Sequence, residues 1–396
     1  MEAELSWIAP RKFINLNTPM INLIKYLLVV ASFTLATPIL ADTNQEATCY
    51  SKYKAGYYDS AFSICTKAAE QGHANAQTNL GLMFDNGQGT PQDYKQAIYW
   101  YTEAAEQGYA NAQYNLGLLY VDDKGTPQDY KQAIYWYTKA AEQGLVDAQY
   151  NLGVMYNTDE DTPQDDKQAF HWFTKAAEQG DASSQSQLGV MFYLGQGTPQ
   201  DYKQAIYWFT KAVKQGSAGA QLNLGIMYNN GEGTPKDYKQ AFHWFTKAAE
   251  QGDASSQSQL GRMFYLGQGT PKDYKQAIYW FTKAVEQGSA GAQLNLGIMY
   301  NNGEGTPKDY KQAFHWFTKA AEQGNAVAQF NVGLMLYNGA GTPKDNVMAY
   351  VWWNIAAAQG SEDAKEARGL IEEEMTPNQI AEAQKLSKEY YAKYVK

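Results

Sequence analysis

Eight prolines recur along the chain at an unbroken spacing of 36 residues, and this spacing limits the possible folds more than any other feature. They are Pro91, Pro127, Pro163, Pro199, Pro235, Pro271, Pro307 and Pro343. A fixed period of roughly 20 to 50 residues is typical of repeat arrays, in which each unit packs on its neighbours. The 396 residues therefore predict one unit copied eight times with modified ends, rather than two or three ordinary domains.

Each unit reads as a pair of antiparallel helices, and residues 217–252 illustrate the first helix. Ser217 is a preferred N-cap residue, and Gly231 follows where a left-handed C-cap is needed. Between them, apolar residues recur at the four-residue spacing of one helix face. These residues are Ala220, Leu224 and Tyr228.

The second helix begins near a threonine–proline pair and ends at Gly252. Thr234, Pro235 and Asp237 fit a capping box with proline at the first helical position. The apolar face of this helix carries Tyr238, Ala241, Trp244, Phe245, Ala248 and Ala249. Two helices of about 15 residues, each about 22 Å long, make an antiparallel hairpin. No stretch has a strand pattern, so the predicted fold class is all-α.

In the first helix of every unit, a glycine directly follows a leucine or valine that recurs with the 36-residue period. The series is Gly81, Gly117, Gly153, Gly189, Gly225, Gly261, Gly297 and Gly333. Glycine inside a helix costs about 1 kcal/mol relative to alanine, so its recurrence must be compensated. Close approach of a neighbouring helix is the expected reason.

The two ends of the array depart from the regular pattern. Residues 42–72 form a degenerate first unit, residues 73–360 hold the eight full repeats, and residues 361–396 form C-terminal capping helices. Terminal repeats are expected to be atypical because one face of each lacks a neighbour. The last helix is expected to start at Thr376-Pro377 and to end near Tyr394.

A longer period of 72 residues overlies the 36-residue period. Residues 181–252 and 253–324 differ only at Val190/Arg262, Gln200/Lys272 and Lys214/Glu286, which indicates duplication of a two-unit block. The third unit differs in another way. Its loop, residues 158–161, lacks both glycines, so its cap geometry is expected to differ.

The N-terminal segment is predicted to be removed. A short apolar run follows Lys25 and ends in small residues at Ala41, as in a secretory signal peptide, so residues 1–41 read as a signal segment with Met20 as a possible true start. The run is shorter than the roughly 20 residues of a membrane span. Export to the periplasm or the exterior is expected, and no stable span remains after cleavage.

The two cysteines, Cys49 and Cys65, both lie near the start of the mature chain. Gly56-Tyr57 lies midway between them, as the turn of a helical hairpin would, and so places the thiols opposite each other. In an oxidising compartment this favours a disulfide that staples the exposed end of the array. Two buried free thiols are the alternative.

The repeated motif Ala-x-x-x-Leu-Gly-x-x-Tyr-x-x-Gly-x-Gly-x-x-x-Asp-x-x-x-Ala-x-x-Trp-Phe/Tyr-x-Lys-Ala-Ala-Glu-Gln-Gly resembles the Sel1-like repeat family, a relative of tetratricopeptide repeats. Residues 220–252 carry it almost entirely, and the match extends over most of residues 57–375. The resemblance implies a right-handed superhelical α-solenoid of antiparallel helix pairs. It also implies an adaptor that binds a protein or peptide in its concave groove, often as an exported bacterial protein.

By analogy with tetratricopeptide repeats, the first helices line this groove, and the resemblance predicts the side chains that face it. They are Asn79, Tyr114, Asn115, Leu118, Tyr150, Asn151, Val190, Tyr193, Leu222, Asn223, Ile226, Arg262, Tyr265, Leu294, Asn295, Ile298, Phe330 and Asn331. The asparagine before Leu-Gly can hold a peptide backbone or carboxylate in related domains. A hydrogen bond between neighbouring units is the alternative. Arg262 marks a groove change in the duplicated block, which drift explains equally well.

Other chemistry finds little support in the sequence. The net charge of -9 argues against nucleic-acid binding. His171, His243 and His315 are 72 residues apart and cannot share a metal, and the acidic run 159–166 lacks the pattern of a calcium loop. No metal or cofactor is therefore expected.

An enzymatic function is the main alternative class. Ser51 and Lys54 match the Ser-x-x-Lys motif of serine β-lactamases and penicillin-binding proteins, without the accompanying Ser-Asp-Asn or Lys-Thr-Gly motifs. Some cysteine-rich Sel1-like proteins are associated with such activity, but they carry a cysteine pair in most repeats. A scaffold that binds polysaccharide or peptidoglycan is a further alternative, and it would need aromatic residues exposed in the groove.

Overall fold

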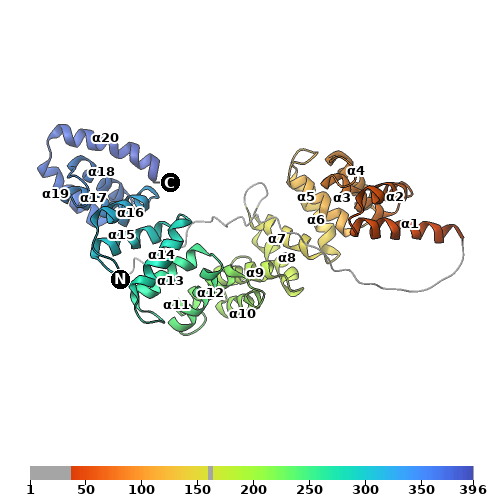
Figure 1. Cartoon of the computed structure of the whole chain (residues 1–396), viewed down its shortest axis with the longest axis horizontal. Coiled ribbons are helices and arrows are strands. Elements are labelled where there is room, and N and C mark those ends of the chain that lie inside the picture. The colour runs from red at the N-terminus through yellow and green to blue at the C-terminus, as the bar shows by residue number, and fades with distance from the viewer. Residues whose placement is uncertain (1–36, 159–163, 396) are drawn as a thin grey trace.

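The computed structural model describes residues 37–158 and 164–395, and within these ranges the chain forms helices and no strands (Figure 1). The all-α prediction is confirmed. Of the expected signal segment, residues 1–36 lie outside the described residues, and residues 37–41 begin the first helix. No described helix is long and apolar enough to cross a bilayer.

The helices are short, and all but the first and last contain 12 or 13 residues rather than the expected 15 or so. In chain order they are α1 (Thr37–Lys54), α2 (Tyr58–Glu70), α3 (Ala74–Asn86), α4 (Tyr94–Glu106), α5 (Ala110–Val121), α6 (Tyr130–Glu142), α7 (Val146–Asn157), α8 (Asp166–Glu178), α9 (Ala182–Leu194), α10 (Tyr202–Val213), α11 (Ala218–Asn230), α12 (Tyr238–Glu250), α13 (Ala254–Leu266), α14 (Tyr274–Glu286), α15 (Ala290–Asn302), α16 (Tyr310–Glu322), α17 (Ala326–Asn338), α18 (Asn346–Ala358), α19 (Glu362–Glu374) and α20 (Pro377–Tyr394).

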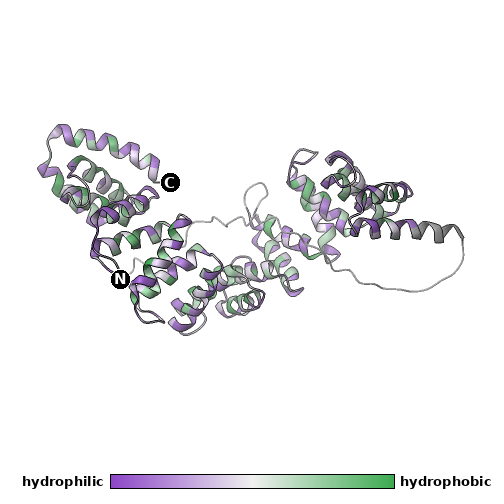
Figure 2. Cartoon of the chain, in the orientation of Figure 1, coloured by the Kyte–Doolittle hydropathy of each residue, from purple (hydrophilic) through white to green (hydrophobic). Residues whose placement is uncertain are grey.

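Consecutive helices pack as hairpins, and each hairpin packs on the next to form a solenoid. Odd-numbered helices α3 to α17 are the first helices of the eight units, and the following even-numbered helices are the second helices. Figure 1 shows the units following one another along an elongated, curving array, as the repeat period predicts. Figure 2 shows hydrophilic and hydrophobic residues alternating around each helix, so that one face of each helix can be buried.

Glycine and aspartate determine where the helices end and begin. Gly231 caps α11 in the left-handed conformation, with φ 80°, and Ser217 caps its start, as predicted. The predicted capping box at Thr234-Pro235 is wrong, because α12 begins at Tyr238 and Asp237 is its N-cap. The Asp237 carboxylate accepts hydrogen bonds from two backbone N–H groups, which a threonine hydroxyl three residues earlier cannot reach. At α20 the capping box of Thr376 and Gln379 does form.

The repeated Leu-Gly pair packs against one aromatic ring of the second helix in the same unit. A Cβ atom added at Gly225 would lie 2.5 Å from the Phe245 ring, and the other units repeat this arrangement with Tyr, Phe or Trp. Phe245 is 1% exposed. The expected close approach is therefore made by a buried aromatic side chain, which occupies the space that a methyl group would need.

Two glutamines per unit connect successive units. Gln257 is buried, its side-chain amide donates to the carbonyl of Ala249 in the preceding unit, and its carbonyl accepts from the Gln287 amide at the end of its own unit. The same glutamine pair occurs in all eight units, with N···O distances from 2.7 to 3.0 Å. These bonds satisfy polar groups within the stack.

The third unit ends its first helix differently, as expected from its missing glycines. The residue after α7, Thr158, is extended with φ -109°, where six other units have a left-handed glycine and the second unit has Asp122 with φ -86°. Residues 159–163 of the acidic loop lie outside the described residues, and Asp165 caps α8 in the usual way.

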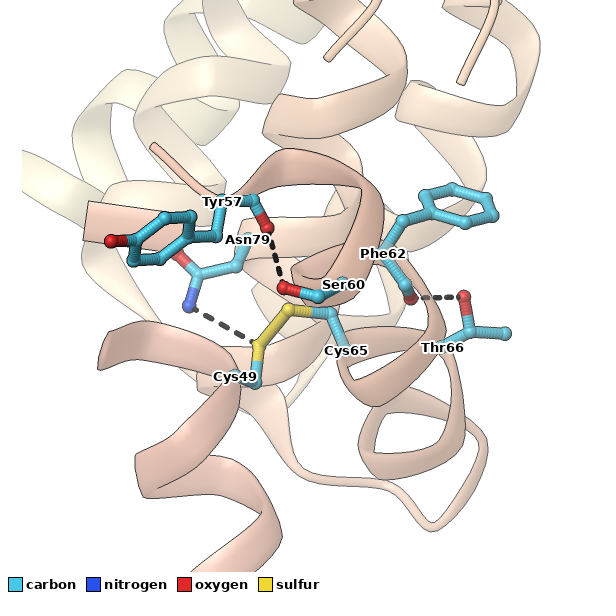
Figure 3. The surroundings of a disulfide bond; sticks show 7 residues. All are labelled: Cys49, Tyr57, Ser60, Phe62, Cys65, Thr66 and Asn79. Atoms are coloured by element: carbon cyan, nitrogen blue, oxygen red, sulfur yellow. Dashed lines mark hydrogen bonds between the residues drawn. A yellow bond between two sulfur atoms is a disulfide. The ribbon is translucent and has the colours of Figure 1, made fainter. Parts of the chain in front are cut away.

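The N-terminal hairpin is closed by a disulfide between Cys49 in α1 and Cys65 in α2, which confirms that prediction (Figure 3). Both cysteines are fully buried, and the amide of Asn79 from α3 lies 3.9 Å from the Cys49 sulfur. The staple thus lies at the junction between the degenerate first hairpin and the first full unit.

Candidate functional site

The first helices present a row of side chains at the position after each Leu-Gly or Val-Gly pair. We call this set the first-helix row, and its members are Leu82, Leu118, Val154, Val190, Ile226, Arg262, Ile298 and Leu334. All lie at the same point of their helix, and none is fully buried. Among the first helices of the eight units, α9 lies in contact with α11 and α13 with α15, so the row members of these two pairs of units are close neighbours.

The row is apolar except at one place. Seven of its members are leucine, valine or isoleucine, and Arg262 is the exception. Arg262 is exposed, whereas Ile226 and Ile298 are half-buried. A stripe of partly exposed aliphatic side chains interrupted by one guanidinium can contact apolar side chains of a ligand and pair with one acidic group.

The residues that the sequence predicted for the groove all lie on first helices, and most of them are half-buried. Asn79 differs because it is only 8% exposed, beside the disulfide, and is therefore the least accessible of the set. Leu222 and Leu294 lie one turn before row members Ile226 and Ile298. These side chains pack partly on the next unit and leave only part of their surface for a ligand.

The asparagines before Leu-Gly have two kinds of partner. The Asn151 amide donates to the Tyr114 hydroxyl of the preceding unit at 3.4 Å. This is the hydrogen bond between neighbouring units that the sequence predicts as the alternative role of these asparagines. Asn295 and Asn331 instead donate to backbone carbonyls one turn earlier in their own helices. Each of these asparagines still has a side-chain oxygen that can accept a hydrogen bond.

Two of the predicted tyrosines connect neighbouring units. The Tyr193 hydroxyl donates to Glu232 and the Tyr265 hydroxyl donates to Glu304, each at 2.9 Å. Burial first, and then the carboxylate of Glu304 that accepts its hydrogen bond, raise the pKa of Tyr265 to about 12. These hydroxyls are thus neutral donors within the stack, and the rings of Tyr193 and Tyr265 pack against Tyr202 and Tyr274.

The residues considered for other chemistry are scattered. His171, His243 and His315 are exposed on second helices, and each ring packs edge-on against the following tryptophan. No cluster that could hold a metal occurs in residues 37–158 and 164–395. Ser51 and Lys54 are exposed near the end of α1.

One exposed member of the row escaped the sequence prediction. Leu334 is 39% exposed on α17, although the sequence predicted only Phe330 and Asn331 for that unit. The signal was available, because Leu334 follows Val332-Gly333 as Ile298 follows Leu296-Gly297. The paired glutamines also escaped prediction, although Gln221, Gln257 and Gln293 recur with the 36-residue period.

Comparison with known proteins supports the repeat assignment. A model of the Sel1 repeat matches residues 58–73, 74–109, 110–145, 146–181, 182–217, 218–253, 254–289, 290–325 and 326–361. Among solved structures, a protective antigen of uropathogenic Escherichia coli with an SLR fold is 32% identical, with a TM-score of 0.64. That alignment covers 90% of this chain and 85% of the other.

Two further relatives differ in how much of their length is shared. A Sel1 repeat protein from Oxalobacter formigenes is 34% identical over 78% of this chain and 89% of its own, with a TM-score of 0.64. DAP3-binding cell death enhancer 1 of Mus musculus is 49% identical over 45 residues, so this chain spans 9% of that protein. Because the repeat matches run from residue 58 to residue 361, most of the chain, the protein belongs to the Sel1 repeat family.

Proposed function

We propose that this protein is a non-enzymatic, exported scaffold that binds an extended segment of a partner protein along the first-helix row. Sel1 repeats generally form scaffolds for protein interaction, and the proposal assigns the row as the binding surface. The observation that carries it is the series of partly exposed aliphatic side chains at equivalent positions of successive first helices, two pairs of which, α9 with α11 and α13 with α15, are in contact.

The spacing of the row suits an extended peptide. Packed helices lie about 8–10 Å apart, so each unit advances the row by about that distance. An extended chain rises about 3.3 Å per residue, so roughly every third residue of the ligand meets the next unit. The side-chain oxygens of Asn295 and Asn331 lie one turn or less from the row and can accept backbone N–H groups.

Arg262 supports a preference for an acidic residue in the partner. It stands where the duplicated block has Val190, so it adds one positive charge to an otherwise aliphatic row. A guanidinium can form two parallel hydrogen bonds with a carboxylate, which fixes the register of the bound segment. The partner segment is therefore expected to carry apolar residues on both sides of an acidic one.

Export is supported by two independent features. Residues 1–41 have the composition of a signal segment, and Cys49 and Cys65 are joined in a disulfide, as is typical of proteins outside the reducing cytosol. The similar proteins from Escherichia coli and Oxalobacter formigenes are bacterial. These features together support the proposal of a periplasmic or secreted location.

Site-specific photo-crosslinking tests the proposed surface. A photoreactive residue at Ile226 or Ile298 is expected to capture a partner in cells, whereas one at Gln240 or Gln312, exposed on second helices, is not. Arg262→Val, which restores the side chain of the equivalent Val190, should weaken capture at Ile298. Equal capture from both helix faces would contradict the assignment of the row.

The enzymatic alternative has a separate readout. Purified protein is expected not to hydrolyse a chromogenic β-lactam, and Ser51→Ala should leave this result unchanged. Turnover that disappears in Ser51→Ala would contradict the proposed scaffold function whatever the crosslinking result.

A further inference from the structure

The second helices of six consecutive units carry the same three-residue pattern on their exposed side: a lysine, an aromatic or histidine ring, and a second lysine. We call this set the outer ridge. Its members are Lys131, Tyr135 and Lys139; Lys167, His171 and Lys175; Lys203, Tyr207 and Lys211; Lys239, His243 and Lys247; Lys275, Tyr279 and Lys283; and Lys311, His315 and Lys319.

The outer ridge faces away from the first helices. In α12, Lys239, His243 and Lys247 are spaced by four residues and so lie on one side of the helix, about 6 Å apart along its axis. Ala241 and Phe245, which pack on the first helices, lie on the opposite side. The outer ridge and the first-helix row are therefore separate surfaces of each unit.

The rings of the outer ridge are held firmly but remain accessible. Tyr135, Tyr207 and Tyr279 are each about half exposed, at 50, 49 and 50%. Each packs edge-on against the tryptophan that follows it, with ring centroids 4.9 to 5.1 Å apart. A half-exposed ring that a second ring holds in place presents a fixed apolar platform at little entropic cost.

The lysines of the outer ridge keep their charge available. Only Lys283 has a carboxylate within ion-pair distance in the part of the chain that the structure describes, at 3.5 Å from Glu286. Lys139 and Lys211 lie over neighbouring aromatic rings, which leaves their ammonium groups hydrated on one side. Twelve lysines in this arrangement are a concentrated positive feature on a protein whose net charge is -9.

The ends of the ridge are defined by the sequence. In α4 the second lysine is replaced by Glu103, and in α18 the corresponding positions are Val347, Val351 and Ile355. Val351 and Ile355 are buried, and α20 packs against α18. The pattern thus stops where the C-terminal helix covers the outer side, and it spans six units, or roughly 50 Å at about 10 Å per unit.

We propose that the outer ridge binds a linear acidic polysaccharide, with lysines paired to sugar carboxylates and the rings stacked on sugar faces. The negative face of an aromatic ring attracts the positively polarised C–H groups of a sugar ring. A single file of platforms flanked by ammonium groups matches a linear polymer that alternates apolar sugar faces with carboxylates. This surface would hold the scaffold on an acidic glycan while the first-helix row stays free.

A membrane or a nucleic acid fits the ridge less well. The ridge has no exposed leucine, phenylalanine or tryptophan that could enter a bilayer, since its tryptophans pack beneath the tyrosine and histidine rings. It has lysines but no arginine, whose planar guanidinium is the side chain best suited to phosphate and nucleic-acid recognition.

Binding to polygalacturonate, a linear polyuronate, tests the proposal on the full chain. The ridge variant replaces six lysines with glutamine: Lys203, Lys211, Lys239, Lys247, Lys275 and Lys283. The control variant makes the same change of charge at six exposed lysines outside the ridge: Lys214, Lys236, Lys272, Lys308, Lys344 and Lys388. A third variant, Tyr207→Ala with Tyr279→Ala, removes two platforms and no charge, and far-ultraviolet circular dichroism checks that each variant is folded.

We expect the parent to bind polygalacturonate at low salt, to bind neutral dextran weakly, and to lose affinity as salt rises. The ridge variant should bind at least about tenfold more weakly with a shallower salt dependence, while the control stays within about twofold of the parent. The tyrosine variant should lose affinity without changing the salt dependence.

Three outcomes would overturn the proposal. One is the absence of polygalacturonate binding by the parent at low salt. Another is an equal loss in the ridge and control variants, which would mean that only total charge matters. The third is tighter, ridge-dependent binding to phosphatidylglycerol vesicles or to single-stranded DNA, which would assign the ridge to a membrane or a nucleic acid.

Discussion

The glycine of each Leu-Gly pair lowers helix propensity but leaves room for a buried aromatic ring. In α11, Gly225 and Gly219 form a matched pair of positions that separates these two effects. Gly225→Ala would place a methyl group 2.5 Å from the buried Phe245 ring. The gain of about 1 kcal/mol in helix propensity is then outweighed by overpacking, which costs typically 1–3 kcal/mol, because the ring has no free space around it. We expect a net loss of up to about 2 kcal/mol in the free energy of unfolding, measured by urea denaturation.

Gly219→Ala in the same helix is the control. The nearest atom to an added methyl group there is the Ser186 hydroxyl oxygen at 3.9 Å, which is an ordinary contact. The substitution should therefore stabilise the protein by about 0.5 kcal/mol through helix propensity alone. A loss of stability at both positions would mean that the Phe245 contact is not the reason for glycine at position 225.

Ionisation of the Tyr265 hydroxyl is expected to lower the stability of the folded protein at alkaline pH. Its pKa is raised from 10.0 to about 12, mainly by burial and then by Glu304. A raised pKa means that the folded state holds the proton more tightly, so the stabilisation is complete below pH 10 and is lost between pH 10 and about 12. Tyr265→Phe should cost about 1 kcal/mol at pH 7, and the difference from the parent should vanish by the end of that window.

Denaturation of both proteins across this pH range measures the difference. Tyr279→Phe is a suitable control, because its ring is half exposed on the outer ridge. A Tyr265→Phe deficit that stayed constant up to the alkaline end would show that the hydroxyl contributes nothing through its ionisation.

At the level of helices, the repeated glutamine pairs are a polar connection that recurs in every unit. Gln257→Leu would remove one hydrogen bond to the Ala249 carbonyl, which keeps the Gly252 N–H, and one from the Gln287 amide, which keeps the Gly252 carbonyl. Each hydrogen bond contributes about 0.5–1.5 kcal/mol net, so a loss of about 1–3 kcal/mol is expected for the two together. Gln276→Leu, at an exposed position of α14, should change stability by less than about 0.5 kcal/mol.

Hydrogen exchange of α12 and α13 would locate the effect of Gln257→Leu at the junction between their units. Faster exchange throughout the chain, with no local increase there, would contradict a role in holding adjacent units together.

The helices were predictable because their signals are local and repeat eight times. Gly231 could be identified as a left-handed cap since glycine, the four-residue apolar spacing and the period agree there. The start of α12 was misplaced because Thr234-Pro235 and Asp237 are both good start signals, and the choice depends on where the chain must turn. The glutamine pairs were missed because periodic apolar patterns give no weight to buried amides.

For the whole molecule, the order of units was readable from the sequence, but the exposed surface was not. Most members of the first-helix row could be predicted from their position directly after the Leu-Gly pair, because equivalent residues of successive repeats have the same environment. The outer ridge was not recognised, since its tyrosines looked like further members of the aromatic core. Only the structure shows that Tyr207 is half exposed while Phe209, two residues later, is buried.

The two-unit period implies that units of alternating type recognise each other. Phe170 packs on Phe192, and Phe242 packs on Phe264 in the same way one block later. Deletion of residues 181–252 would place Phe264 against Phe170, which recreates a native junction. We therefore expect this shortened protein to fold with parent-like helicity per residue and a cooperative thermal transition.

Deletion of the single unit 217–252 is the matched comparison, and it should be less stable. It would place Phe264 against Ile206 in place of Phe242, and Gln268 opposite Tyr193 in place of Glu232. The lost aromatic pair and hydrogen bond contribute roughly 1–3 kcal/mol together, so its thermal midpoint should fall below that of the longer deletion, although it retains one more unit. In a stack held by nearest-neighbour contacts, the shorter array would otherwise be the less stable. Equal midpoints, or a lower midpoint for the two-unit deletion, would mean that the units are interchangeable and that the 72-residue period records only the history of duplication.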